Sequence, residues 1–357
     1  MQLTLEIRKR TFDFAFNAKT SRGTMPERIC WFLLVRDRSY NDIIGIGEVA
    51  PIFGLSKEQP RQIEADLVKL TEWINQYENS KLPSDLSEIN AEIKELELCS
   101  AVRFGIEMAL LDLVHGGNRT VFDSDFKNGM SIPINGLVWM ADADTMLSQA
   151  ESKILQGFSC IKFKVGSLDF DVEVGLIRTI RQKYTPEQLQ IRLDANGAFT
   201  SEEALSKLQI LSDFEIHSIE QPIAAGNIAA LKDICKKSPI PIALDEELIG
   251  LDRIDKAGFL KEVNPSFLIL KPSLHGGFYQ CAAWINAANS ANVGWWITSS
   301  LESAYGLNAI AQFVAQYRPQ IPQGLGTGQI FTNAPKSPLM VQNGFISYDS
   351  SLNWEEI

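Results

Sequence analysis

The alternation of apolar and polar positions divides the chain into parts with different patterns. In the first 125 residues, strand-like stretches come first and helical periodicity follows. These stretches cover residues 2–16, 29–35, 43–49, 58–77 and 101–114. Strands followed by helices, without alternation between the two, are typical of a small α+β domain. The pattern therefore predicts such a domain over residues 1–125.

From about residue 126 onward, short apolar stretches alternate with stretches of helical periodicity. The predicted strands cover residues 132–138, 160–165, 190–195, 217–221, 241–245, 267–271, 295–299 and 322–326. Predicted helices lie between them, over 170–184 and 201–214 for example, with Asp169 and Thr200 at N-cap positions. Eight strands in one alternating series predict an α/β fold with a β/α barrel over residues 126–330.

An open, doubly wound sheet is the main alternative to a barrel. Such sheets usually carry a glycine-rich phosphate-binding turn after their first strand. Here the first predicted strand is followed by Trp139-Met140-Ala141-Asp142, which lacks that turn. Beyond the barrel, residues 331–357 contain two short apolar stretches around Asn343-Gly344, a dipeptide typical of β-hairpin turns. We expect this hairpin to pack back on the first domain.

Composition and charge exclude some classes of function. Lys and Arg number 33 and Asp and Glu 44, so the formal net charge is −11, which argues against nucleic acid and anionic membranes as partners. No apolar stretch approaches the ~20 residues of a membrane span. The five cysteines are scattered, without Cys-x-x-Cys, and predict free thiols in the reducing cytoplasm. The three histidines lack metal-ligand spacing, so a metal site would need oxygen ligands.

Two lysines share one face of the predicted strand 160–165. Side chains alternate along a strand, so Ile161 and Phe163 point one way and Lys162 and Lys164 the other. In a barrel the apolar face meets the helices, which turns both lysines inward. Two ammonium groups ~7 Å apart repel each other and resist desolvation. Such a pair needs nearby negative charge or a function.

The following strands supply that negative charge. Asp194, Glu220 and Asp245 each end a predicted strand on its inward face, and Lys271 ends the next one. Successive residues of this series are separated by about one β/α unit, so each strand delivers one charged group to the same level of the barrel mouth. Taken alone, Asp194 fits a turn and Asp245 a helix N-cap. Six charged residues in phase with the inward face favour a site over these structural roles.

Three carboxylates on adjacent strands suit one hard divalent cation, Mg²⁺, with Mn²⁺ as a substitute. Lysines beside that cation lie in a positive field, which lowers their pKa and makes a neutral lysine available as a base. A divalent cation with flanking lysines suits abstraction of a proton α to a carboxylate, with the metal stabilising the enediolate. The predicted partner is therefore a small carboxylate substrate.

In order and spacing, the motifs at these strands resemble those of the enolase superfamily, in its muconate-lactonizing-enzyme subgroup. They are Lys162-x-Lys164, Asp194-Ala195-Asn196, Glu220-Gln221-Pro222, Asp245-Glu246 and Lys271-Pro272. The resemblance covers essentially the whole chain. It implies a (β/α)₇β modified TIM barrel, an N-terminal α+β capping domain and a C-terminal return of residues 331–357 to the cap.

The resemblance also assigns roles to these residues. Asp194, Glu220 and Asp245 would bind Mg²⁺, and Lys164 and Lys271 would lie on opposite faces of the substrate. Lys162 would hold Lys164 and the substrate carboxylate electrostatically. Three further residues are expected to support this site from a second layer: Arg192, Asn196 and Glu246.

The ends of the seventh and eighth predicted strands narrow the expected reaction. Residues 298–303 read Thr-Ser-Ser-Leu-Glu-Ser, and 324–328 read Gly-Leu-Gly-Thr-Gly. The Asp-x-Asp with which dipeptide epimerases of the subgroup hold an α-ammonium is absent. The resemblance then implies syn dehydration of 2-succinyl-6-hydroxy-2,4-cyclohexadiene-1-carboxylate, a lyase step of menaquinone biosynthesis. Ser299 and Ser300 would hydrogen-bond the succinyl carboxylate.

Two loops of the capping domain are expected to supply specificity. The polar, glycine-containing loop 20–24 would act as a closing lid and carries Arg22 as a substrate contact. Loop 50–56 carries Phe53, the expected apolar contact to the substrate ring.

Sister activities remain open alternatives at this point. Racemisation of N-succinylamino acids and epimerisation of dipeptides use the same two lysines and Mg²⁺. A barrel that keeps these residues only for stability is disfavoured, because unpaired buried charge is costly. A monomer and a homo-oligomer are both compatible with the sequence.

Overall fold

The computed structural model describes residues 2–20, 23–38, 43–79, 81–328 and 330–357. The chain starts with an antiparallel sheet of order β1-β2-β3. Its strands are β1 (Leu3–Thr20), β2 (Gly23–Asp37) and β3 (Ile44–Val49). The helices that follow are α1 (Pro60–Asn75), α2 (Leu86–Ile93) and α3 (Ser100–Val114).

Helix α3 lies directly against the sheet, which explains why two glycines face each other there. A Cβ added to Gly47 on β3 would lie 1.9 Å from the carbonyl oxygen of Gly105 on α3. Only glycine permits this approach of helix to strand. As a result, nearly every residue of α3 is buried between the sheet and the barrel helix α9.

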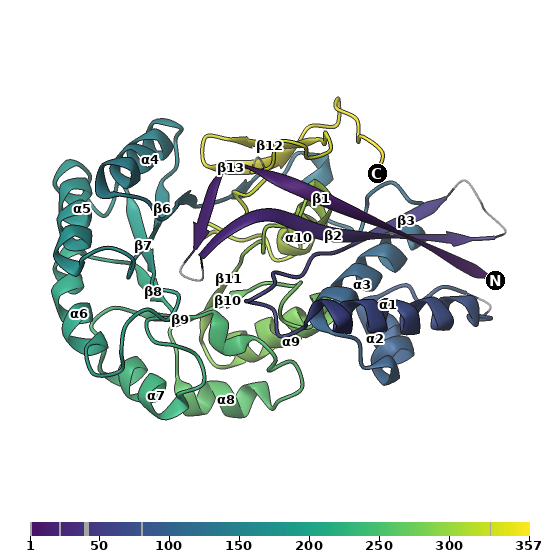
Figure 1. Ribbon diagram of the computed structural model, residues 1–357, viewed down its shortest axis with the longest axis horizontal. Coiled ribbons are helices and arrows are strands. Elements are labelled where there is room, and N and C mark those ends of the chain that lie inside the picture. Colours follow the sequence, from purple (N-terminus) through teal and green to yellow (C-terminus); the bar gives the residue numbers. More distant parts are fainter. Residues whose placement is uncertain (1, 21–22, 39–42, 80, 329) are drawn as a thin grey trace.

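Seven parallel strands form the second sheet, in the order β11-β10-β9-β8-β7-β6-β5. The strands are β5 (Gly136–Val138), β6 (Cys160–Lys164), β7 (Gln190–Asp194), β8 (Ser218–Glu220), β9 (Ile242–Leu244), β10 (Phe267–Leu270) and β11 (Gly294–Ile297). The helices between and after them are α4 (Ala143–Leu155), α5 (Phe170–Lys183), α6 (Ala204–Leu211), α7 (Ile228–Lys237), α8 (Lys256–Val263), α9 (Gly277–Ser290) and α10 (Ala304–Ala315). Helices α5 to α8 form an arc outside the strands, and α1 and α2 lie on the opposite side of the molecule (Figure 1).

The predicted eighth strand, 322–326, takes an irregular form. It makes isolated parallel bridges, with Gln323 opposite Ile134 and Gly324 opposite Thr298. The amide of Asn135 donates to the carbonyl of Gln323 (2.9 Å), and the amide of Gly324 donates to that of Ile297 (2.8 Å). This segment therefore connects the first and last strands and closes the barrel. Pro322 has no N–H to donate, which keeps the ladder short.

The predicted first barrel strand, 132–138, is divided. Its start, β4 (Ile132–Pro133), pairs with the C-terminal hairpin of β12 (Leu339–Gln342) and β13 (Phe345–Tyr348). That hairpin, predicted from Asn343-Gly344, is confirmed. Residues just before it contact β1, where the amide of Ala15 donates to the carbonyl of Ile330 (2.8 Å). The division of the chain after residues 125 and 330 stays a prediction.

Helix starts follow the capping rules, with one displacement. Asp169 accepts from the amide of Asp171 and caps α5, as predicted. Thr200 and Glu203 form a reciprocal capping box, with each side chain accepting from the other's amide (3.3 and 3.1 Å), but α6 itself begins only at Ala204. In the structure, the predicted helix 201–214 therefore consists of the shorter helix α6 followed by a 3₁₀ turn. The 3₁₀ helices are η1 (Lys94–Leu96), η2 (Asp125–Asn128), η3 (Ser212–Phe214) and η4 (Glu246–Leu248).

Within the described ranges, every helix is too short or too polar to cross a bilayer.

Candidate active site

The charged residues predicted from the strand pattern meet at the carboxyl ends of adjacent strands. The parallel register places Lys164 of β6 beside Asp194 of β7, and Asp194 beside Glu220 of β8. Asp245 follows β9 and Lys271 follows β10. The aliphatic residues between them face the helices and form the core. The alternation of side chains along each strand thus puts all these charges into the barrel mouth.

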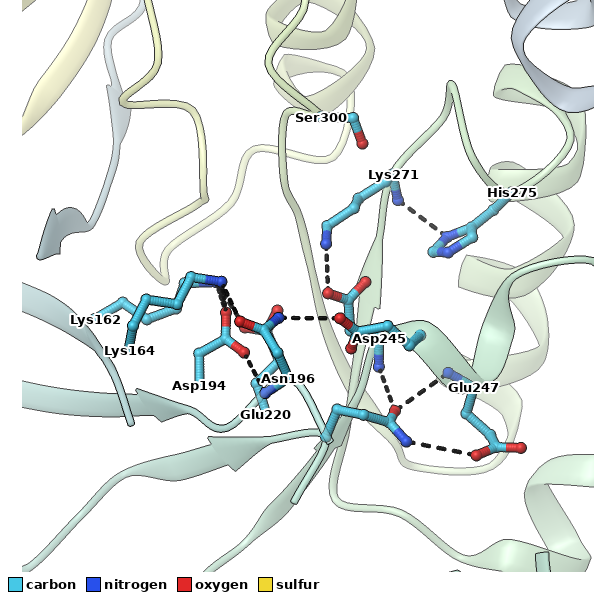
Figure 2. A network of polar contacts seen from close by, with 12 residues as sticks. Lys162, Lys164, Asp194, Asn196, Glu220, Asp245, Glu247, Lys271, His275 and Ser300 are labelled. Carbon is cyan, nitrogen blue, oxygen red and sulfur yellow. Dashed lines mark hydrogen bonds and ion pairs between the residues drawn. The ribbon is translucent and has the colours of Figure 1, made fainter. Parts of the chain in front are cut away.

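Lys162 and Lys164 bind the same carboxylate. The ammonium of Lys162 donates to Asp194 Oδ2 (3.0 Å) and Glu220 Oε2 (2.8 Å). The ammonium of Lys164 donates to Asp194 Oδ2 (2.6 Å) and to Asn196 Oδ1 (2.7 Å). Asp194 and Glu220 are almost completely buried. The negative charge that the lysine pair required is therefore supplied by the next two strands, as predicted (Figure 2).

Lys271 lies across the barrel mouth from this pair. Its ammonium binds Asp245 Oδ2, and its backbone amide donates to His275 Nδ1 (3.1 Å). In Figure 2, Lys164 and Lys271 approach from different sides, with the carboxylates between them. Because β6 and β10 are separated by three strands in the sheet, the two lysines face one another over the carboxylates.

Burial and crowding change the pKa values of this cluster. Burial, with the neighbouring Asp194 charge, raises the pKa of Glu220 to about 7. Burial also raises the pKa of Asp245. For Asp194 burial acts in the same direction, but Lys162 and Lys164 outweigh it and hold the pKa well below its usual range. The raised pKa values of Glu220 and Asp245 mean that the neighbouring ammonium groups do not fully offset burial and the repulsion among the carboxylates.

The lysine ammoniums respond in the opposite direction. Burial would lower the pKa of Lys271, but the Asp245 and Glu220 carboxylates outweigh burial and raise it. The pKa of Lys162 is raised in the same way by Asp194 and Glu220. The lower lysine pKa expected beside a divalent cation stays a prediction.

The carboxylate cluster fits a hard cation by its chemistry. Glu220 Oε1 and Asp245 Oδ1 are buried oxygens without a hydrogen-bond partner among the described residues. A buried carboxylate oxygen without a partner is costly, and a cation would relieve that cost. The described side chains hold no ready group of three His, Cys, Asp or Glu around one metal position. The lysine ammoniums instead bind one oxygen of each of the three carboxylates.

Asn196 and Glu246 lie where a supporting layer was predicted. Asn196 Nδ2 donates to Glu246 Oε1 (3.0 Å), while Asn196 Oδ1 accepts from Lys164. Arg192 behaves differently. It lies one layer below Asp194, donates to the carbonyl of Pro322 (2.8 Å), and stacks over Trp296 at 4.0 Å. Its described contacts therefore support the barrel wall rather than the carboxylates.

Gln221 supports the site and was not singled out from the sequence. Its Oε1 accepts from the amides of Asp245 (3.3 Å) and Glu247 (3.2 Å), and its Nε2 donates to the carbonyl of Ile223 (3.0 Å). One buried amide thus connects the end of β8 to the end of β9. The signal was present, since a glutamine directly after Glu220 in a buried strand end needs partners.

A cavity over the charged cluster is lined from both parts of the molecule. Lys162, Lys164 and Lys271 form its floor, and the capping domain contributes Phe53 and its neighbours. Phe53 is 40% exposed, so its side chain is accessible to a ligand. From the other predicted loop, residues 20–24, Gly23 lines the cavity. Arg22 lies outside the described residues.

Ser299 and Ser300 line the same cavity with different hydroxyl partners. Ser299 Oγ donates to Glu302 Oε2 (2.6 Å) and accepts from Thr327 Oγ1 (2.8 Å). Ser300 Oγ is buried without a partner among the described residues. Glu302, which the sequence argument missed, also accepts from the Ser300 amide (2.6 Å) and from Ser273 Oγ (2.5 Å). An acid directly after a serine-rich strand end was the available signal.

Comparison with known proteins agrees with this geometry. A family model described as enolase C-terminal domain-like matches residues 145–350, more than half of the chain. The chain belongs to the enolase superfamily. The predicted α/β class, with a modified TIM barrel and an N-terminal cap, is confirmed.

Relatives within the superfamily cover nearly the full length. The chain is 41% identical to o-succinylbenzoate synthase of Desulfotalea psychrophila, over 96% of this chain and 98% of that protein. It is 28% identical to o-succinylbenzoate synthase of Haemophilus influenzae, over 83% and 81%.

Among the solved structures, too, a protein of D. psychrophila matches at higher identity than an epimerase. The crystal structure of MenC from D. psychrophila superposes with a TM-score of 0.88 at 39% identity, covering 97% of this chain and all of that one. The L-Ala-D/L-Glu epimerase of Bacillus subtilis superposes with a TM-score of 0.83, covering 98% and 96%. At 20% identity, the likeness to the epimerase shows the fold alone.

Proposed function

We propose that this enolase-superfamily protein is an o-succinylbenzoate synthase, a lyase that dehydrates 2-succinyl-6-hydroxy-2,4-cyclohexadiene-1-carboxylate. The observation that carries the proposal is the 41% identity over 96% of the chain to a protein of that activity. The epimerases matched are more distant in sequence, although they share the fold.

The two opposed lysines account for the proton transfers. Lys164 removes the proton α to the carboxylate and returns a proton to the departing hydroxyl on the same face, which makes the elimination syn. Lys271 stays protonated on the other face, where its ammonium stabilises the charge that develops. Lys162 bridges Asp194 and Glu220 and keeps those carboxylates and Lys164 in place.

Mg²⁺ is the cofactor we assign, with Mn²⁺ able to replace it. Asp194, Glu220 and Asp245 would hold the ion, and the unpartnered oxygens of Glu220 and Asp245 support this choice. The bound cation would supply positive charge for the substrate carboxylate as its α-proton leaves. Asn196 and Glu246 would fix the neighbouring Asp194 and Lys164 side chains.

Residues of the cavity wall would bind the succinyl arm of the substrate. Ser300 offers a buried hydroxyl without a partner in the described part of the chain, so it can donate to the distal carboxylate. Ser299 would act through its neighbours, because its hydroxyl is already bound by Glu302 and Thr327. Phe53 would contact the ring from the capping side, and Arg22 stays a predicted contact from the first loop.

We place the enzyme in the cytoplasm. All five cysteines are free thiols in the described structure. Free thiols are typical of a reducing compartment.

The decisive experiment supplies the diene carboxylate with Mg²⁺ and follows the loss of its ultraviolet absorbance. We expect steady conversion to o-succinylbenzoate. An N-succinylamino acid and an Ala-Glu dipeptide serve as parallel substrates. Racemisation or epimerisation of either, without dehydration of the diene, would replace the synthase assignment by a sister activity.

Chelation tests the metal assignment separately. We expect excess EDTA to stop turnover while circular dichroism shows the fold retained, and Mg²⁺ to restore the rate. Undiminished turnover in EDTA would contradict a role for the carboxylate cluster in metal binding.

A further inference from the structure

Arg28 is a buried arginine of the capping sheet whose guanidinium reaches both the cap and the barrel. It lies on β2, is 3% exposed, and has only backbone carbonyls as its described hydrogen-bond partners. Burying a guanidinium costs much unless its donors are satisfied. An arginine kept at such a place therefore does more than fill space.

The carbonyls that Arg28 binds belong to two segments about 250 residues apart in the chain. On the cap side its Nη1 and Nη2 donate to the carbonyls of Pro51 and Ala50. On the barrel side Nη2 donates to the carbonyl of Ser300 (3.0 Å) and Nε to that of Leu301 (3.2 Å). The planar guanidinium has fixed donor directions, so it sets the distance between the two segments.

The cap segment carries the apolar wall of the substrate cavity. Loop 50–56 is compact, because the amide of Ile52 donates to Ser56 Oγ (2.9 Å) and that of Leu55 donates to the carbonyl of Ile52 (2.9 Å). Arg28 binds the carbonyls of Ala50 and Pro51 at the base of the loop, so it anchors the loop as one unit. The exposed Phe53 ring is placed over the cavity by this unit.

The barrel segment carries the polar wall. Leu301 has φ = +62°, a left-handed conformation that costs a residue with a side chain ~1 kcal/mol or more. Glu302 holds the Ser300 amide, and Arg28 holds the carbonyls of Ser300 and Leu301. The left-handed turn thus keeps the unpartnered Ser300 hydroxyl in the cavity wall, on the side of Lys271 (Figure 2).

We infer that Arg28 is a positioning residue for substrate binding: it couples the cap loop 50–56 to the Ser300–Leu301 turn, so that the ring contact and the distal-carboxylate contact form together. The inference rests on the proposed function for the identity of the substrate. The described contacts of Arg28 include neither the lysines nor the carboxylate cluster. Its loss should therefore weaken binding of the carboxylate with its long arm and leave proton transfer nearly unchanged.

The kinetic test uses Arg28→Lys and Arg28→Met in the Mg²⁺-loaded enzyme. Lysine keeps the charge but cannot span both segments. We expect KM for the diene carboxylate to rise at least tenfold in both variants, with kcat within about threefold of the parent. Arg36→Lys and Arg36→Met are matched controls, because Arg36 lies on the same strand but pairs with Glu6 (3.1 Å) away from the cavity. They should change neither constant.

A double-mutant cycle tests the coupling itself. Combining Arg28→Lys with Phe53→Ala should raise KM by less than the product of the two separate changes, because both act on one unit. A fall in kcat at unchanged KM would overturn the inference. So would a lowered melting temperature with both constants unchanged, which would leave Arg28 with a purely structural role.

Chymotrypsin gives a readout that needs no activity. Cleavage after Phe53 should accelerate at least fivefold in Arg28→Lys, while cleavage after the exposed Phe345 of the C-terminal hairpin stays constant. If the parent enzyme did not dehydrate the diene, the proposed function would fail, yet this cleavage would still decide whether Arg28 holds the loop. Equal cleavage after Phe53 in parent and variant would overturn the inference.

Discussion

Ser299 and Ser300 are neighbours in the chain, but their hydroxyls have opposite surroundings. The Ser299 hydroxyl is bound on both sides, by Glu302 and Thr327, whereas the Ser300 hydroxyl is buried with no partner among the described residues. A satisfied hydroxyl stabilises the fold, and an unsatisfied one is available to a ligand. The two serines should therefore separate stability from substrate binding.

We expect Ser300→Ala to raise KM for the diene carboxylate by about tenfold with kcat nearly unchanged, since one hydrogen bond to a charged group is lost. Ser299→Ala should instead lower the free energy of unfolding by ~1–2 kcal/mol, because Glu302 and Thr327 lose a buried partner. Steady-state kinetics and urea denaturation of both variants check this. Equal effects of the two substitutions on KM would contradict the distinction.

Lys164 is the general base of the proposed reaction. Lys164→Ala should reduce kcat by at least about 10³-fold, because the α-proton loses its acceptor. The melting temperature should fall little, since Asp194 keeps Lys162 as a partner. Lys183→Ala, at an exposed lysine paired with Glu151, is the control and should leave kcat unchanged. Surviving activity in Lys164→Ala would assign the base elsewhere.

At the scale of elements, the ends of β8 and β9 are held together by one side chain. Gln221 has φ = +41° and binds the amides of Asp245 and Glu247. Two of the proposed metal ligands, Glu220 and Asp245, therefore keep their relative position through an amide that binds no metal itself.

Gln221→Asn keeps the amide and tolerates the left-handed backbone, but it is one methylene too short to reach both amides. We expect Mg²⁺ affinity to fall about 10- to 100-fold, with the rate at saturating Mg²⁺ less affected. The Mg²⁺ dependence of the rate measures this. Gln320→Asn, at an exposed glutamine that contacts the carbonyl of Arg318, should leave affinity unchanged.

The pattern along the strands predicted the barrel and the charged cluster because both depend on local alternation. Lys162 and Lys164 had to face inward once Ile161 and Phe163 faced the helices, and each following strand obeyed the same rule. The closing segment at Gln323 and Gly324 was predicted as a regular strand. In the structure it makes only isolated bridges, and the sequence of a short bridged segment does not differ visibly from that of a strand.

Other parts of the site could not be derived from local patterns. Arg28 acts through backbone carbonyls of other segments, the most distant of them 273 residues away in the chain. A backbone group carries no signature of its residue type, so a contact to it leaves no pattern in the sequence. Arg192 faces inward, as its phase required, but its described partners are Trp296 and the carbonyl of Pro322. The alternation of side chains along a strand predicts the face on which a residue lies, but it does not predict the partners of that residue.

At the scale of the whole molecule, a buried acid joins the cap to the barrel and makes stability depend on pH. Glu107 on α3 accepts from the amides of Phe278 (2.5 Å) and Tyr279 (3.3 Å) at the start of α9. Burial raises the pKa of Glu107 from 4.5 to about 8. Between these values the folded protein holds a proton that the unfolded chain releases, so the free energy of unfolding falls as pH rises.

The expected slope from this one group is up to about 1.4 kcal/mol per pH unit between roughly pH 5 and 8. Glu107→Gln cannot titrate and should show a correspondingly flatter dependence. Urea denaturation at several pH values, at constant Mg²⁺, measures both proteins. Glu95→Gln, at an exposed residue of η1, is the control. Parallel slopes for the parent and Glu107→Gln would contradict the raised pKa.

The contact between β1 and residues 330–332 bears on how the protein is synthesised. β1 lies at the edge of its sheet, and Asp13 and Ala15 find their partners in Thr332 and Ile330. On the ribosome, β1 emerges long before these partners, which emerge only after the whole barrel. Throughout that interval the nascent chain presents an unpaired strand edge beside Phe14, which is a template for wrong pairing. Ribosome-arrested chains that end before residue 330 should therefore bind chaperones more strongly than chains that extend beyond the hairpin.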